Sequence, residues 1–364
     1  MTRYIDVLGA LVLLELRQRI RSVAWVVLVS VVFVLVGVVT ALLWASLSAF
    51  GGDEARASGV YSTIIFFVLL VGTLVTPAIS GGAINGERDA GTLATTQVTL
   101  ASAGQIVLAK FLAAWTVALT FLAASLPALA FTLIDGGVRG DTLAASLGVL
   151  VLELGVVAGI GVGLSGLITR PLFSVVTTYL VVAALSIGTL IAFGLGGLAF
   201  QSERTQTYIG IDYSVGGEFD PNTGLPEEIR CLEPDTYTYT QPRFDRVWGI
   251  LAANPYVVLA DAAPTSFTND GYPQDLFGQI ALGVRGAQIA PASEEVIDEC
   301  QAALDGTYDE LWQSQNPREV FESTVPSWFV GLLIHALLAA AALGGAVVRT
   351  RTPAGLLPKG SRVA

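Results

Sequence analysis

The 364-residue sequence has few charged side chains: Asp, Glu, Lys and Arg make up 13% of it, against 53% hydrophobic residues. It has two lysines, and neither Lys110 nor Lys359 follows a glycine, as the phosphate-binding loop G-x-x-x-x-G-K-[ST] requires. It also has only three Cys and His residues in total, whereas a closed zinc site needs about four such ligands. These shortages argue against ATP hydrolysis at such a loop and against a structural zinc site within the chain.

Long uncharged stretches make up much of the sequence. They cover residues 22–52, 57–86, 111–134, 171–202 and 323–348, and 142–169 is interrupted only by Glu153. Each has the roughly 20 apolar residues that a helix needs to cross a hydrocarbon layer of about 30 Å. Together with a mean hydropathy of +0.66, they predict an all-α polytopic membrane protein with six transmembrane helices.

The division of the chain follows from these stretches. Residues 1–21 carry Arg3, Arg17 and Arg21 on one side of a helical wheel, which favours a helix lying in the membrane interface. The predicted parts are an interfacial helix 1–21, transmembrane helices one to five in 22–202, a mixed α/β extracytoplasmic domain 203–325, a sixth transmembrane helix 326–349 and a tail 350–364.

The basic residues near the spans indicate the orientation. Eleven Lys and Arg residues and only four acids lie on one side of the predicted membrane, whereas the short loops 51–58 and 135–141 on the other side hold two arginines. Because basic residues concentrate in cytoplasmic loops, both termini are expected in the cytoplasm. Arginine outnumbers lysine 17 to 2 amid abundant Ala, Val and Gly, which points to the cytoplasmic membrane of a high-GC bacterium.

The expected outer segment is strongly acidic. Residues 203–322 hold 6 arginines and 21 Asp and Glu, a balance of −15, so the chain's low pI belongs to this segment and gives no basic surface for nucleic acid. It also holds both cysteines. An oxidising compartment favours a disulfide between Cys231 and Cys300, with two free thiols as the alternative.

Three patterns predict local structure in the outer segment. Residues 236–240, Thr-Tyr-Thr-Tyr-Thr, alternate like a strand. Residues 291–306 are expected to form a helix that places Val296, Cys300 and Leu304 on one face. The apolar run 247–260 is too short to cross a membrane and is broken at Asn254 and Pro255, which favours a pair of short helices dipping into the outer leaflet.

One cytoplasmic loop resembles a known family. Residues 87–93 have the sequence Glu-Arg-Asp-Ala-Gly-Thr-Leu and are followed, after a capping box at Ser102 and Gln105, by Ile-Val-Leu-Ala-Lys at 106–110. This pattern is similar to the first cytoplasmic loop of ABC type-2 transporter permeases, although Thr96 to Thr99 lacks that family's proline. The likeness covers about residues 1–200 and 325–350.

The resemblance implies a function for loop 84–105. In that family this loop is a coupling helix docked on a separate ATPase subunit, with ATP and Mg bound by the partner and no cofactor bound by the permease. It also implies a second permease copy or homologue in the assembly. The positions carried over as ATPase-coupling residues are Glu87, Arg88, Asp89, Gly91, Thr92 and Leu93.

Two ionisable residues inside the predicted spans are further candidates. A charge at mid-membrane costs about 2.5–3.5 kcal/mol, so Glu153 is expected to face a cavity, a partner or another helix. It either lines a transport path, alone or with His335, or is a neutral carboxyl bonded to a neighbouring helix. The glycines Gly155, Gly159 and Gly163 recur at every fourth position and favour close helix packing.

The sequence therefore predicts the membrane subunit of an ATP-driven exporter, not itself an enzyme, with an amphiphilic, lipid-like or peptide-like cargo as the family expectation. Two alternatives stay open. One is a sensor or mechanical transmitter in which ATPase motion drives the acidic outer domain to act on an extracytoplasmic partner. The other is an ion-coupled secondary transporter that uses Glu153 and His335.

Overall fold

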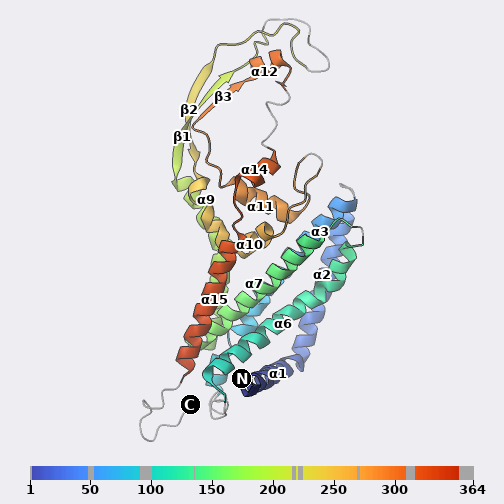
Figure 1. Cartoon of the computed structure of the whole chain (residues 1–364), viewed down its shortest axis with the longest axis vertical. Helices are drawn as coiled ribbons and strands as arrows, with labels where there is room; N and C mark the ends of the chain where they lie inside the picture. Colours follow the sequence, from blue (N-terminus) through green and yellow to red (C-terminus); the bar gives the residue numbers. More distant parts are fainter. Residues whose placement is uncertain are drawn as a thin grey trace.

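The computed structural model describes residues 2–47, 53–90, 101–134, 136–214, 219, 224–268, 271–308 and 316–351, and it is mostly helical. A long helical bundle carries a smaller mixed domain at one end (Figure 1). Helix α1 (Thr2–Ile20) and the last turn of α15 (Trp328–Thr350) lie at the opposite end of the bundle.

Within the described ranges, six helical segments are long and apolar enough to cross a membrane, which agrees with the number predicted from the sequence. Five of them are α2 (Val23–Leu47), α3 (Asp53–Ser80), α6 (Ala103–Thr132), α7 (Gly140–Leu167) and α15. The sixth is formed by α8 (Pro171–Ala183) and α9 (Thr189–Ala199), joined through one π-helical turn at Ala184–Gly188.

Helix α7 forms the centre of the bundle, because its glycines let other helices approach closely. A Cβ atom on Gly155 would lie 3.0 Å from the Trp115 ring, and one on Gly163 would lie 2.4 Å from the Ala342 Cβ atom of α15. Gly159 likewise faces Ala339 of α15. The three glycines predicted to serve helix packing therefore pack within the chain.

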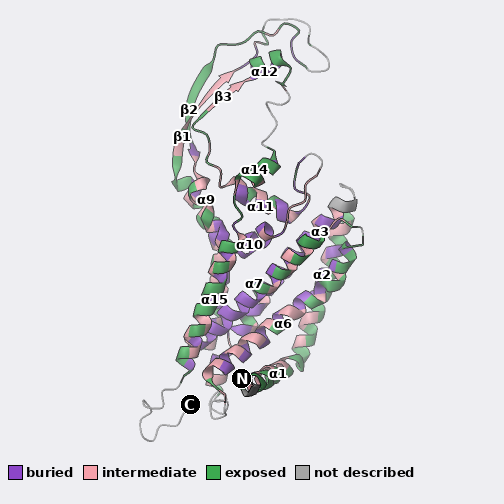
Figure 2. Ribbon diagram, viewed as in Figure 1, coloured by how far each residue is buried: buried purple, intermediate pink, exposed green. Residues whose placement is uncertain are grey.

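The outside of the bundle is apolar. Figure 2 shows α2, α9 and α15 with long exposed stretches, and the exposed side chains there are large and hydrophobic, such as Val23 on α2, Leu180 on α8 and Leu337 on α15. Soluble proteins rarely leave such continuous apolar surface uncovered. This surface and the six long helices suggest a multi-pass membrane protein.

The second part of the molecule is built on a three-stranded sheet in the order β2-β1-β3. Strand β1 (Gln201–Ile209) follows α9 directly, pairs antiparallel with β2 (Asp235–Pro242), and pairs parallel with β3 (Glu294–Asp298). The strand predicted at 236–240 is thus confirmed within β2.

The helix predicted over 291–306 is wrong in its first half, where β3 occupies the chain. Only α12 (Glu299–Asp305) is helical, and it ends at Gly306, whose φ of 73° is the left-handed conformation that glycine adopts readily. Val296 and Leu304 are 66% and 55% exposed, while Cys300 is fully buried. The three residues do not share a buried face, because Val296 belongs to the strand.

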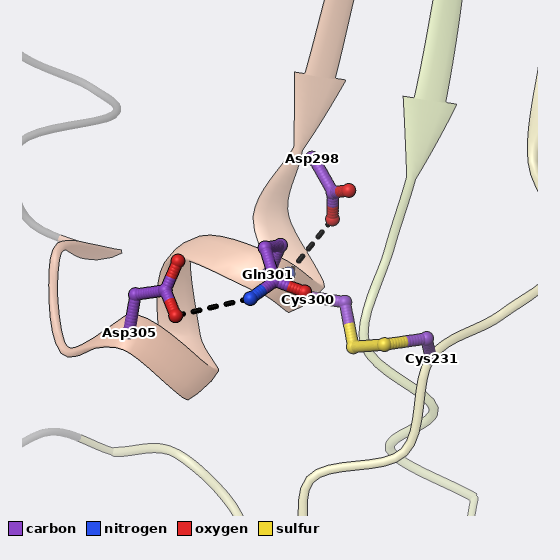
Figure 3. The surroundings of a disulfide bond; sticks show 5 residues. All are labelled: Cys231, Asp298, Cys300, Gln301 and Asp305. Carbon is purple, nitrogen blue, oxygen red and sulfur yellow. Dashed lines mark hydrogen bonds between the residues drawn. A yellow bond between two sulfur atoms is a disulfide. The ribbon is translucent and has the colours of Figure 1, made fainter.

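The predicted disulfide between Cys231 and Cys300 is present (Figure 3). Asp298 caps α12 by accepting a hydrogen bond from the Gln301 backbone at 2.7 Å, so the strand-to-helix turn holds Cys300 toward Cys231. Next to it, the buried Glu299 accepts hydrogen bonds from Tyr208 and Tyr308, and its carboxylate raises the pKa of Tyr208 to about 12. These contacts fasten β1 to α12.

Short helices connect the sheet to the bundle. Residues 247–260 form a 3₁₀ helix, η3 (Trp248–Ala253), and α10 (Pro255–Ala262), which confirms a pair of short helices broken at Asn254 and Pro255. They are followed by α11 (Leu276–Gly286) and, before α15, by α14 (Pro317–Ser323). The 3₁₀ turn η2 (Phe244–Arg246) precedes them.

Candidate functional site

The loop that resembles a coupling helix is helical where the structure describes it. Helix α4 (Asn85–Asp89) follows α3 after a tight turn, at the same end of the bundle as α1. The capping box predicted at Ser102 and Gln105 is confirmed and begins α6. The candidates Gly91, Thr92 and Leu93 lie outside the described residues.

Glu87 of α4 points into the protein rather than away from it. Its carboxylate lies 2.6 Å from the ammonium group of Lys110 on α6, and the same ammonium lies 2.6 Å from the carboxylate of Glu15 on α1. Lys110 is only 3% exposed, so it sits buried between two carboxylates. This contact joins α1, α4 and α6, and removing the lysine would leave two acids facing each other.

A second buried contact joins α4 to the end of α7. The hydroxyl of Ser165 accepts hydrogen bonds from the backbone N–H groups of Ile84 and Asn85, at 2.8 and 3.2 Å. The Asn85 side chain accepts from Ser165 and donates to the carbonyl of Ile168, both at 3.1 Å. Asn85 is fully buried, so α4 is fixed to α7 as firmly as to α6.

Arg88 and Asp89 are the next two residues of α4 after Glu87. Asp89 is exposed and Arg88 is partly buried. These two charges lie on a segment that buried contacts join to α1, α6 and α7. The geometry separates the predicted coupling residues into one that positions the segment, Glu87, and two that are accessible, Arg88 and Asp89.

The two ionisable residues predicted inside the spans touch each other in the middle of the molecule. The Nδ1 atom of His335 on α15 lies 2.8 Å from one oxygen of Glu153 on α7 and 3.0 Å from the other. The His335 Nε2 atom lies 2.9 Å from the carbonyl oxygen of Ala253 in η3. Both side chains are about 1% exposed.

The hydrogen bonds fix how many protons the pair holds. A carbonyl only accepts, so Nε2 carries a proton that it donates to Ala253. The contact between Nδ1 and the Glu153 carboxyl then needs one more proton between two groups that would otherwise both be acceptors. Whichever group carries it, the pair has no net charge, which is how a carboxyl and an imidazole can be buried together at low cost.

Asn254 makes three hydrogen bonds that connect short helices, whereas the sequence indicated only that it breaks a helix. Its side-chain N–H groups donate to the Ser186 carbonyl at 2.6 Å and to the Thr189 hydroxyl at 2.9 Å, and its oxygen accepts from the Tyr256 backbone at 2.9 Å. Ser186 lies in the π-helical turn, where the α-helical bonding pattern is interrupted. The junction of η3 and α10 thus binds α9 through Asn254 and α15 through Ala253.

A buried ion pair fastens the start of α15 to the same short helices. The carboxylate of Asp261 on α10 accepts from Arg285 of α11 at 2.7 Å and from the backbone N–H and hydroxyl of Ser327. Arg285 also donates to the Thr324 carbonyl at 3.2 Å. The carboxylate faces the N-terminus of α15, where a negative charge is stabilising.

An apolar groove lies on the side of the bundle between α2 and α6. It has a volume of about 410 Å³, and Trp44 and Phe131 stand at one end with ring centroids 4.8 Å apart. Thr40 is the one polar residue in its lining. Among the described residues, no group of three or more His, Cys, Asp and Glu side chains is arranged to hold a metal ion.

Comparison of the chain with models of known protein families and with curated protein sequences gives no match.

Proposed function

We propose that this chain is the membrane subunit of an ATP-driven exporter of the ABC type-2 class. The observation that carries the proposal is α4 itself, a short helix with two accessible charges, Arg88 and Asp89, fixed by buried contacts to helices on either side. A force applied to such a segment is passed on to α1, α6 and α7 together. The ATP and Mg would be bound by a separate ATPase subunit.

The rest of the molecule supports the same proposal. The apolar exterior suits a bilayer, the sheet domain would lie outside the cytoplasmic membrane where a disulfide is stable, and a second copy would complete a pair of coupling helices. The groove beside α2 and α6 would open laterally toward lipid, which favours an amphiphilic cargo. Glu153 and His335 would then hold α7 and α15 together rather than bind the cargo.

The test is co-purification from native membranes. Reversing the accessible charges with Arg88→Glu and Asp89→Lys is expected to abolish recovery of an ATPase subunit, because charge-assisted hydrogen bonds across the contact would become repulsive. The matched control is Arg139→Glu with Asp141→Lys, which reverses an exposed ion pair of 2.6 Å at the opposite end of the bundle. Glu87 is left intact because its loss would disturb Lys110.

Wild-type protein and the control variant are expected to retain the ATPase. Equal recovery with the α4 variant would remove α4 as the docking element. Absence of any ATPase from gently solubilised wild-type membranes would contradict the exporter proposal as a whole.

The contact between Glu153 and His335 favours a second candidate, an ion-coupled transporter. A buried pair that shares one proton is the kind of group that such a transporter protonates and deprotonates. Cargo flux would then follow a proton gradient without ATP and would stop in Glu153→Gln. Flux in vesicles that depends on ATP and is unchanged when the gradient is collapsed would exclude this candidate.

A further inference from the structure

Strand β2 leaves one edge of the sheet open. Its eight residues pair with β1 on one side, and no other described strand pairs with it. In an antiparallel pair every second residue directs its N–H and C=O groups away from the partner strand. Each residue from Asp235 to Thr240 is exposed, and Figure 2 shows β2 exposed along the outer margin of the sheet. A row of backbone donors and acceptors is therefore accessible.

The open edge lacks the features that normally prevent strand addition. Proteins protect such edges with lysine, proline or a bulge. Here the pairing of β2 with β1 is continuous from Asp235 to Pro242, so no bulge interrupts it, and proline occurs only as the last residue. From Thr236 to Thr240 the exposed side chains are threonine and tyrosine, which favour the extended conformation. An edge of this kind accepts a further strand by main-chain pairing.

The charge of the sheet decides which strand would bind. The three strands hold one arginine and five acids, a net charge of −4, and Arg204 is already paired with Glu295. The acids are Glu203, Asp235, Glu294, Glu295 and Asp298. Edge-to-edge pairing with a second copy would bring together two segments 203–322 that each carry a balance of −15, which is unfavourable. A cationic segment is attracted instead.

The side chains beside the open edge suit long basic residues. Tyr237 and Tyr239 project from the same face of β2, 47% and 38% exposed, with ring centroids 5.9 Å apart. Residues of an added strand on this face would lie next to these rings. A lysine or arginine there packs its aliphatic stem on a ring and places its charge within reach of the π face.

We propose that the open edge of β2 binds an extended, cationic peptide segment as a fourth strand of the sheet. The inference rests on the sheet alone and not on the coupling of α4 to an ATPase. The segment would belong to a partner protein on the same side of the membrane as the sheet.

The experiment uses the full-length chain in nanodiscs and a fluorescently labelled peptide of alternating valine and lysine. Binding is followed by fluorescence anisotropy. A peptide of the same sequence, N-methylated at every second residue, keeps the charge but cannot pair along that edge, and it is expected to bind at least about tenfold more weakly. A valine and glutamate peptide is expected not to bind.

Two variants test the protein side. Asp235→Lys with Glu203→Lys is expected to weaken binding of the lysine peptide several-fold, whereas Glu319→Lys on α14, an exposed acid outside the sheet, should leave it unchanged. Equal binding of the N-methylated and unmodified peptides would overturn strand addition. Absence of peptide binding, together with dimers that disappear in Thr238→Lys, would assign the edge to a second copy and also overturn the proposal.

Discussion

Replacing Glu153 and His335 singly and together gives a sharp test of the buried pair. His335→Leu removes the donor to Ala253 and leaves the Glu153 carboxyl without its partner. Each buried polar group left unsatisfied costs about 1–3 kcal/mol, so this variant is expected to lose about 2–6 kcal/mol of unfolding free energy. Glu153→Leu leaves only His335 Nδ1 unsatisfied and should lose about 1–3 kcal/mol.

The double variant tests whether Glu153 and His335 are in direct contact. With leucine at both positions only the Ala253 carbonyl is left unsatisfied, so the loss should be smaller than the sum of the two single losses by about 2–6 kcal/mol. Glu153→Gln is the conservative control, because its amide N–H can still donate to Nδ1 and its stability should stay close to that of the wild type.

The assay is chemical denaturation of the purified protein in mixed micelles, followed by intrinsic fluorescence, for the wild type and the four variants. Losses that add within about 0.5 kcal/mol would refute a direct contact between Glu153 and His335. A Glu153→Gln variant as unstable as Glu153→Leu would refute the proton count, since both arrangements of the shared proton tolerate an amide at this position.

Three further predictions concern the short helices and the three-stranded sheet. Burial raises the pKa of Asp275 to about 6 from 3.8. Between these two values the folded chain holds a proton that the unfolded chain loses, so the free energy of unfolding should fall by about 2 kcal/mol from about pH 4 to about pH 6, and by about 3 kcal/mol in all once the carboxyl is ionised in the folded chain. Asp275→Asn keeps the helix cap but has no carboxyl to titrate, so its stability should not fall in this way. An equal fall of stability with pH in the wild type and the variant would contradict this prediction. Asn254→Ala loses a helix cap and the donor to Ser186, so it should lower the free energy of unfolding by about 2–4 kcal/mol. Its melting temperature should be lower than that of the conservative variant Asn254→Ser. Equal melting temperatures for the two variants would argue against this role of Asn254. Reduction of the bond between Cys231 and Cys300, which are 69 residues apart, should lower the stability of the sheet domain by about 4 kcal/mol in urea titrations. No such change should occur when a variant with both cysteines replaced by serine is treated with the reductant.

Local signals in the sequence predicted local structure well. The six apolar runs, the capping box at Ser102 and Gln105 and the helix break at Asn254 each depend on neighbouring residues, and each is present in the structure. The helix over 291–306 failed for the opposite reason. Its first residues join a sheet through β1, about 90 residues earlier in the chain, and Val296 follows that pairing rather than its own helical spacing.

Contacts between distant segments could not be predicted in the same way. Glu153 and His335 are 182 residues apart, and nothing in either span specifies which face of one helix meets the other. Lys110 lay within the motif that resembled a coupling loop, yet its position between Glu15 and Glu87 depends on how α1, α4 and α6 are placed. The sequence predicts which helix or loop contains such a residue, whereas its contacts with other segments depend on how the helices pack.

The π-helical turn at Ala184–Gly188 lets the helix hold one extra residue while α9 keeps its orientation. Such a turn holds one residue more than an α-helical turn, and each residue of an α-helix accounts for about 100° of rotation. Rewinding Ala184–Gly188 as regular α-helix at unchanged chain length would rotate Thr189 by about that angle, away from Asn254. Deleting one residue would instead give a regular helix with Thr189 in nearly its present orientation, so homologues without that residue could keep the same side chains on the face of α9 that meets the short helices.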